Sequence, residues 1–331
     1  NKSQDGRTTA DIFGKCLHTY LIKDAIFDHN VLGFNVEYIK TFNGQYDPTD
    51  NTKVQNIDTQ EVFDSPERLN LIARHIVKYH DIKTHNRRYN ALFAVSGVDV
   101  LIKYYDIFKN LHTDLKIAAI FTFGANEEAE FKDEHSRDAL ERIIADYNQL
   151  YKTNYDTNTF SAYANDLMKK IKTAQIDIVI VVGMMLTGFD AKVLNTLYID
   201  KNLEYHNLLQ AYSRTNRVEH STKPFGNIVC YRNLKENTDN AIRLFSQTNS
   251  VDEVLTQDLN FYITKLKQAV NDLIRIAPTA ENVDDLQTEE QLRDFILAFR
   301  KVSRLQNILG NFTEFDFDKY ITAINMQDFM D

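Results

Sequence analysis

The stretch IDIVIVVGMMLTGFDAKVLNTLYID, residues 176–200, contains two short apolar runs joined by a loop. Residues 176–182 are almost unbroken in β-branched side chains, and residues 194–200 form the second run. Runs of this length and apolarity predict strands that are buried on both faces, as the strands of a covered parallel sheet are. The loop LTGFD (186–190) follows the first strand, and ligands of such sheets bind at the carboxyl ends of strands. The stretch therefore predicts an α/β fold with a candidate site in this loop.

The same alternation of strand and helix extends in both directions. Apolar runs at 90–96, 116–123 and 226–232 predict further strands, and helical patterns occur at 98–110, about 131–151 and 160–173. A helix start is marked before the first of these strands, because Ser65 can cap it, Pro66 suits the first helical position and Glu67 suits the positive helix end. We therefore predict an α/β domain over residues 60–248, with helices on both faces of a parallel sheet.

Two different segments flank this domain. Residues 1–59 are predicted to be a connector, with a helix at 14–29, a strand-like segment at 31–42 and a polar loop at 43–59. After about Val251 the strand signals stop, and the remaining sequence has helical periodicity with mixed charge. We predict that residues 249–331 form an all-helical extension that packs on another surface.

The composition is typical of globular proteins with long regular elements. Hydrophobic residues make up 43% and charged residues 26%, with only 4 Pro and 10 Gly. The sequence has no apolar run of about 18 residues and no signal-peptide pattern, so we expect no membrane partner and a cytoplasmic location. Cys16 and Cys230 are far apart, which indicates a reducing compartment and no disulfide framework. The sequence does not start with Met, so we expect it to begin within a longer protein.

The charge limits how the chain can bind nucleic acid. The formal net charge is −9, and the pI is about 5.5. This balance argues against binding through bulk positive charge, but it leaves a local positive groove possible.

The segment LLQAYSRTNRVEHS, residues 208–221, carries such a local charge. No acidic residue lies between Glu204 and Glu219, and a helix here would place Gln210, Arg214 and Arg217 on one face. Paired arginines suit phosphate, since each guanidinium can bind two oxygens and stays charged. The alternative is that the two arginines pair with acidic side chains elsewhere, such as Asp190.

These motifs resemble the fifth and sixth motifs of superfamily 2 helicases, and most of all those of the motor and restriction (R) subunit of type I restriction-modification enzymes. In that family a strand ends in T-G-F-D, a short strand ends in D-K, and a helix carries Q-A-x-S-R-T-N-R. All three occur here, at residues 187–190, 200–201 and 210–217. Residues 91–109 are similar to the fourth motif, and residues 13–38 resemble the link that follows the first motor domain. The likeness covers most of residues 10–235.

The resemblance implies a RecA-like fold and a role for each matching position. Arg217 would be the arginine finger and Arg214 would also reach the terminal phosphate of ATP, which is held with Mg²⁺ between two motor domains. Gln210 would lie at the same cleft, and Gly188 and Asp190 would couple the nucleotide to DNA. Ser96 and Thr187 would contact the phosphates of duplex DNA. The implied partners are duplex DNA and the specificity and methyltransferase subunits of the restriction complex.

Other family motifs are missing. The sequence contains no G-x-x-x-x-G-K-[ST] loop and no nuclease domain, so we expect ATP to be bound mainly by a first motor domain and this chain alone to be inactive. DEHS (133–136) mimics a helicase D-E-x-H box, but it lies in a polar helical stretch. His75, His80 and His85 recur every five residues, which spreads them around a helix, so no metal site is predicted. HNRRYN (85–90) is a small basic and aromatic patch, for which a solvated loop is favoured over a phosphate contact.

Two rival functions follow from the same motifs. The chain could be the second motor domain of another superfamily 2 translocase, which different neighbouring domains would reveal. It could also be a degenerate helicase domain that serves only for docking, in which case Arg214 and Arg217 would be replaceable.

Overall fold

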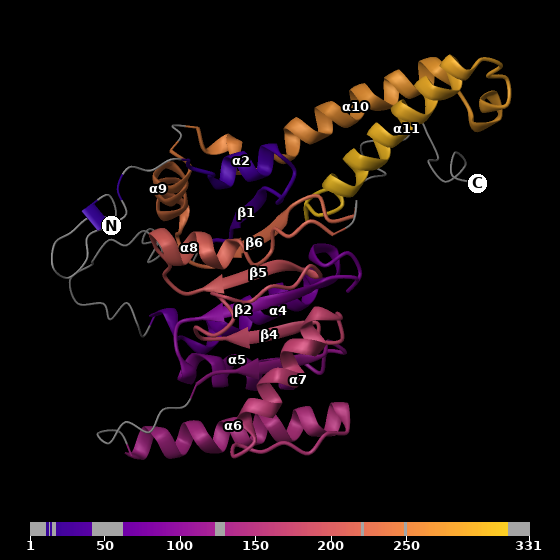
Figure 1. Cartoon of the computed structure of the whole chain (residues 1–331). Helices are drawn as coiled ribbons and strands as arrows, with labels where there is room; N and C mark the ends of the chain where they lie inside the picture. The colour runs from indigo at the N-terminus through magenta and orange to yellow at the C-terminus, as the bar shows by residue number, and fades with distance from the viewer. Residues whose placement is uncertain are drawn as a thin grey trace.

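The computed structural model describes residues 11–12, 14, 18–41, 62–122, 130–219, 222–247 and 250–316. Within these residues a parallel sheet has the strand order β1-β6-β5-β2-β4-β3 (Figure 1). Its strands are β1 (Phe34–Tyr38), β2 (Asn90–Val95), β3 (Ile117–Ile120), β4 (Ile178–Val181), β5 (Leu194–Asp200) and β6 (Gly226–Cys230). Every residue of β2, β4, β5 and β6 is buried, which confirms the prediction of strands covered on both faces.

Helices cover both faces of this sheet. They are α2 (Ile22–Phe27), α4 (Pro66–Lys83), α5 (Val98–Asn110), α6 (Glu130–Tyr151), α7 (Phe160–Lys172), α8 (Tyr205–Tyr212) and α9 (Lys235–Ser246). Neighbouring residues at the end of β6 show the two layers, since Tyr231 contacts His75 of α4 while Cys230 contacts Tyr212 of α8. Figure 1 shows α4 and α5 on one side of the sheet and α7 and α8 on the other. The predicted α/β class, a parallel sheet with helices on both faces, is confirmed.

The local sequence accounts for several element limits. Pro66 occupies the start of α4 and Ser65 its cap position, as predicted, but the Ser65 side chain makes no capping hydrogen bond. The predicted helix at 14–29 differs, because among the described residues it is helical mainly over Ile22–Phe27, and Cys16 lies outside them. The DEHS segment lies in α6, as expected of a polar helical stretch. The predicted loop at 43–59 lies outside the described residues.

The connector contributes a strand to the sheet. β1 pairs in parallel with β6, from Phe34 opposite Gly226 to Tyr38 opposite Cys230. Phe34 is fully buried and packs edge-on against the ring of Tyr212. Residues 34–38 therefore complete one edge of the α/β core, although our predicted domain begins only at residue 60.

The helical extension is a hairpin with its own small core. α10 (Leu259–Ile276) and α11 (Glu289–Leu309) pack through buried residues such as Leu266, Leu273 and Val302, and in Figure 1 they project away from the sheet. Asn311, just past α11, ties the hairpin to the α/β core: its backbone oxygen accepts from Lys83 at 2.7 Å and its side-chain oxygen from Asn227 at 3.1 Å.

Candidate functional site

The helix that was predicted to carry both arginines ends before it reaches them. α8 stops at Tyr212, and the chain turns at residues 213–216, where the buried Thr215 donates its hydroxyl to the carbonyl of Tyr212 at 2.8 Å. Arg217 then forms an antiparallel bridge with Val31. The expectation of a shared helical face for Gln210, Arg214 and Arg217 is therefore wrong, because strand-like pairing with the connector replaces the last helical turn.

The arginines nevertheless meet the loop that the sequence paired with them. We call residues 186–194 the TGFD loop and residues 213–223 the arginine segment. Arg214 donates to the backbone carbonyl of Phe189 and, at 3.0 Å, to that of Gln210. Arg217 forms an ion pair with Asp190, with 2.8 Å between Nε and Oδ1. The structure thus brings four of the predicted site residues together: Gln210, Arg214, Arg217 and Asp190.

The ion pair between Arg217 and Asp190 is the alternative that the sequence left open. The Arg217 side chain is 40% exposed and the Asp190 side chain 62%. Exposed pairs of this kind contribute only about 0–1 kcal/mol, so a phosphate group could replace Asp190 at small cost. Arg214 is more enclosed: burial, and then the charge of Arg217, lower its pKa from the ordinary value. The Arg214 guanidinium nevertheless remains cationic at neutral pH.

The arginines do not lie at the carboxyl edge of the sheet, as the strand-end argument suggested. Residues 215–217 run beside the amino ends of β1 and β6, where the carbonyl of Asn216 accepts from the amide of Leu32 at 2.8 Å. α8 runs back across the sheet after β5, and no helix separates β4 from β5, so the TGFD loop reaches the same end. Arg214, Arg217 and Asp190 therefore lie away from the strand ends that hold Ser96.

Ser96 lies at the carboxyl edge of the sheet, and the chain that leads into the TGFD loop leaves β4 at this edge. Ser96 directly follows β2 and is exposed, as are Thr187 and Gly188. Gly188 has a φ of +70°, a backbone conformation that glycine adopts without strain. Lys201, after β5, donates to the carbonyl of Val182 after β4 at 2.7 Å and so links the two strand ends. This edge presents the hydroxyl of Ser96, whereas Thr187 is exposed within the loop that runs from this edge towards β5.

The sequence did not single out Lys223, which holds the same loop. This side chain is buried, and its ammonium donates to the carbonyls of Lys192 at 2.6 Å and Leu194 at 2.9 Å. Burial lowers the pKa of Lys223 to about 7. In the sequence TKPFG it looks like an ordinary surface lysine, and only the tertiary contacts reveal it.

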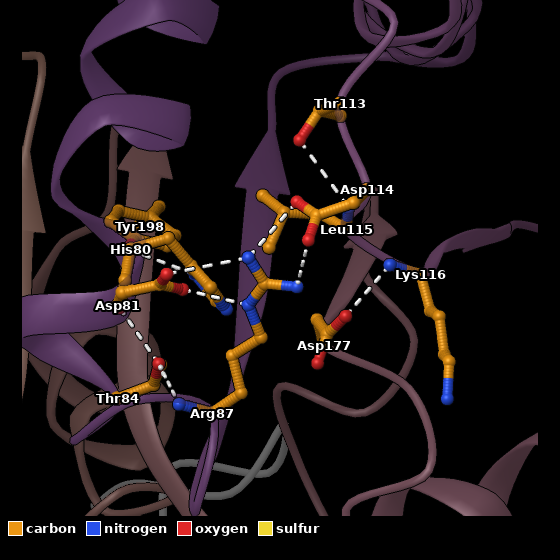
Figure 2. Close-up of polar contacts among 10 residues, drawn as sticks. All are labelled: His80, Asp81, Thr84, Arg87, Thr113, Asp114, Leu115, Lys116, Asp177 and Tyr198. Atoms are coloured by element: carbon orange, nitrogen blue, oxygen red, sulfur yellow. Dashed lines mark hydrogen bonds and ion pairs between the residues drawn. The ribbon is translucent and has the colours of Figure 1, made fainter.

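Within the basic patch at residues 85–90, Arg87 is committed to structural contacts. Figure 2 shows Arg87 between two carboxylates, with its Nε 2.7 Å from Asp81 and its terminal nitrogens 2.9 Å from Asp114. Hydrogen bonds with Asp81 and Asp114 raise the pKa of Arg87 above its ordinary value. These ion pairs join the end of α4 to the turn before β3.

Two histidines of α4 also have structural contacts. His75 lies 2.9 Å from the hydroxyl of Tyr231, and His80 lies 3.3 Å from that of Tyr198. Burial lowers the pKa of both to about 4, which keeps them neutral. Over the described ranges, no group of three or more His, Cys, Asp or Glu side chains is placed to hold a metal ion. In the same ranges, no helix has the length and apolarity needed to cross a membrane.

Comparison with known proteins gives consistent matches along the chain. The family model described as "Type I restriction enzyme subunit R domain 3" matches residues 87–233, and the one described as "Type I restriction and modification enzyme - subunit R C terminal" matches residues 254–331. Among solved structures, the DNA-bound type ISP restriction-modification enzyme LlaBIII is 12% identical over 86% of this chain and 21% of its own, with a TM-score of 0.36. That score is too low to add to the assignment.

Curated relatives match at much higher identity. The Staphylococcus aureus (strain COL) protein "Type I restriction enzyme SauCOLORF180P endonuclease subunit" is 51% identical over 96% of this chain and 35% of its own length. The Staphylococcus saprophyticus protein "Type I restriction enzyme SsaAORF53P endonuclease subunit" is 52% identical over 100% of this chain and 37% of its own. This chain thus spans about a third of the length of these relatives. It belongs to the family of type I restriction enzyme R subunits.

Proposed function

We propose that this chain is the second motor domain, with the start of the helical region, of an ATP-dependent DNA translocase and endonuclease subunit. Arg217 acts as the arginine finger, and Arg214 reaches the same terminal phosphate of ATP. ATP and Mg²⁺ are held mainly by a first motor domain, since this sequence lacks the phosphate-binding loop. The single observation that carries the proposal is the exposed guanidinium of Arg217, held at the molecular surface by a weak ion pair with Asp190.

The geometry suggests how nucleotide and DNA are coupled. When the γ-phosphate draws Arg217 away, Asp190 loses its partner, and Asp190 belongs to the same loop as Thr187 and Gly188. A shift of this loop changes the contact of Thr187 with the DNA phosphates, while Ser96 contacts the strand from the end of β2. Phosphoryl transfer gains from positive charge placed on the developing oxygens, which an arginine finger provides.

The test is ATP hydrolysis by the full-length subunit with its partner subunits, with and without duplex DNA. We expect Arg217→Ala to lower the DNA-stimulated rate by about 10³-fold or more while ATP binding is largely kept. Arg243→Ala on α9 removes an exposed arginine from the same domain and serves as the matched control. An Arg217→Ala subunit that hydrolyses ATP like the wild type would show that Arg217 is structural. DNA cleavage by the wild-type complex separates a restriction subunit from a translocase of another kind.

A further inference from the structure

Three cationic side chains of the arginine segment hold successive positions of the TGFD loop. Arg214 binds the carbonyl of Phe189, Arg217 binds Asp190, and Lys223 binds the carbonyls of Lys192 and Leu194. The first two are motif residues with predicted roles at ATP, whereas nothing assigns a role to Lys223. These contacts connect the TGFD loop to Arg214, Arg217 and Lys223.

Lys223 is an expensive way to hold a loop. It is 2% exposed, and among the described residues its ammonium contacts backbone carbonyls rather than a carboxylate. Burying a cation costs free energy, and the charges of Glu219 and Asp190 offset only part of this cost.

The residue between the two carbonyls that Lys223 binds is itself hydrogen-bonded to the sheet. Lys192 and Leu194 flank Val193, whose carbonyl accepts from the amide of Asn90 at 3.1 Å, at the start of β2. Lys223 therefore fastens the end of the TGFD loop to the rigid sheet, two residues from Asp190. Loss of this anchor frees Asp190 to move. Before the γ-phosphate draws Arg217 away, the ion pair would carry its guanidinium with Asp190, so the finger would approach the phosphate from a displaced position.

We propose that Lys223 is a positioning residue: by anchoring the carbonyls of Lys192 and Leu194 it sets the place of Asp190 and, through it, of Arg217. The inference rests on the proposed role of Arg217 as the finger. A displacement of about 1 Å in such a group can cost about 10²-fold in rate without loss of substrate binding.

The experiment is steady-state ATP hydrolysis, with duplex DNA, by the full-length subunit carrying Lys223→Met in its complex. We expect kcat to fall by about 10–100-fold and KM for ATP to change by less than about twofold, since only the finger is displaced. Lys169→Met, which removes an exposed lysine from α7, should leave both constants unchanged. A wild-type kcat in Lys223→Met would overturn the inference while leaving the role of Arg217 intact.

The double variant shows whether Lys223 acts through Arg217. In an Arg217→Ala background, Lys223→Met should cost almost nothing further, because the finger it positions is absent. If the two substitutions lower kcat by independent factors that multiply, the inference is overturned. If Arg217→Ala alone leaves kcat unchanged, the proposed function itself is overturned. If Lys223→Met does not fold, Lys223→Gln decides: its amide keeps a donor on a shorter stem, so we expect an intermediate kcat, and either an unchanged kcat or a loss that does not depend on Arg217 would refute the role.

Discussion

Arg68 on α4 and Asp200 at the end of β5 form a bidentate ion pair, with nitrogen–oxygen distances of 2.9 and 2.7 Å, although 132 residues separate them in sequence. Arg232 binds the same carboxylate at 2.8 Å and the hydroxyl of Tyr104 donates to it at 2.7 Å. Burial raises the pKa of Asp200, but these partners outweigh it and lower the pKa below the ordinary value. Asp200 belongs to the D-K pair of the family motif, and here it holds α4, α5 and the end of β6 together.

Replacing this carboxylate should lower the free energy of unfolding of the domain. Asp200→Asn leaves two buried guanidiniums without a counter-charge, which typically costs about 3–5 kcal/mol. Urea denaturation of the chain, followed by circular dichroism, measures the change. Asp239→Asn breaks the exposed pair with Lys235 on α9 and should cost less than about 0.5 kcal/mol. Equal losses in the two variants would contradict the importance of the buried cluster.

The start of β6 depends on a glycine. A Cβ on Gly226 would overlap the side chain of Thr215. The hydroxyl of Thr215 donates to the carbonyl of Tyr212 in the turn that follows α8. Gly226→Ala should therefore destabilise the chain by about 1–3 kcal/mol, as overpacked cores do. Gly183→Ala is the matched control, because nothing lies within 4 Å of its added Cβ and its φ is not positive. The comparison is made by thermal unfolding, and a Gly226→Ala midpoint equal to that of Gly183→Ala would refute the clash.

Local patterns predicted some parts of this fold closely. The limits of α5 and β5, at 98–110 and 194–200, agree with the sequence because apolar periodicity and buried β-branched runs determine them locally. The end of α8 could not be predicted in this way, since its helical pattern continues past Tyr212. Pairing of Arg217 with Val31, 186 positions earlier, overrides that pattern.

The candidate site also contains features that the sequence predicts and features that only tertiary contacts determine. The meeting of the arginine segment and the TGFD loop followed from recognisable motifs, and the ion pair between Arg217 and Asp190 was one of the two alternatives. Arg68, Arg232 and Lys223 carry no motif of their own. Their partners are a carboxylate or backbone carbonyls that only tertiary folding brings near, so the sequence offered no signal for them.

Low pH should destabilise the chain through the histidines of α4. Burial lowers the pKa of His75 and His80 to about 4, below the ordinary value of 6.5. Between these values the unfolded chain binds more protons, so the free energy of unfolding falls as pH drops from 6.5 towards 4. His80→Phe removes one of the two groups and should flatten this dependence in urea denaturation series. A His80→Phe curve parallel to the wild type would show that His80 does not contribute.

The buried ammonium of Lys223 predicts a pH dependence of the same sign at alkaline pH. Its pKa is about 7 in the folded chain against an ordinary 10.5, because burial disfavours the cation more than Glu219 and Asp190 favour it, and Arg217 opposes it too. Between these two values the unfolded chain binds the extra proton, so the free energy of unfolding of the wild type rises with pH in this window. Below about pH 7 both states are protonated and the cost of burying the cation is fully present. Lys223→Met lacks this group.

The measurable quantity is the difference in unfolding free energy between Lys223→Met and wild type at about pH 6.5, 8 and 9.5. Asp190, Glu219 and Arg217 are present in both proteins, so their own contributions largely cancel in the difference. We expect the unfolding free energy of the variant, relative to that of the wild type, to be highest at pH 6.5 and to decrease steadily as pH rises. A difference that stays constant over the three pH values would mean that Lys223 keeps its proton in the folded chain, and that its cost to the fold is smaller than its burial indicates.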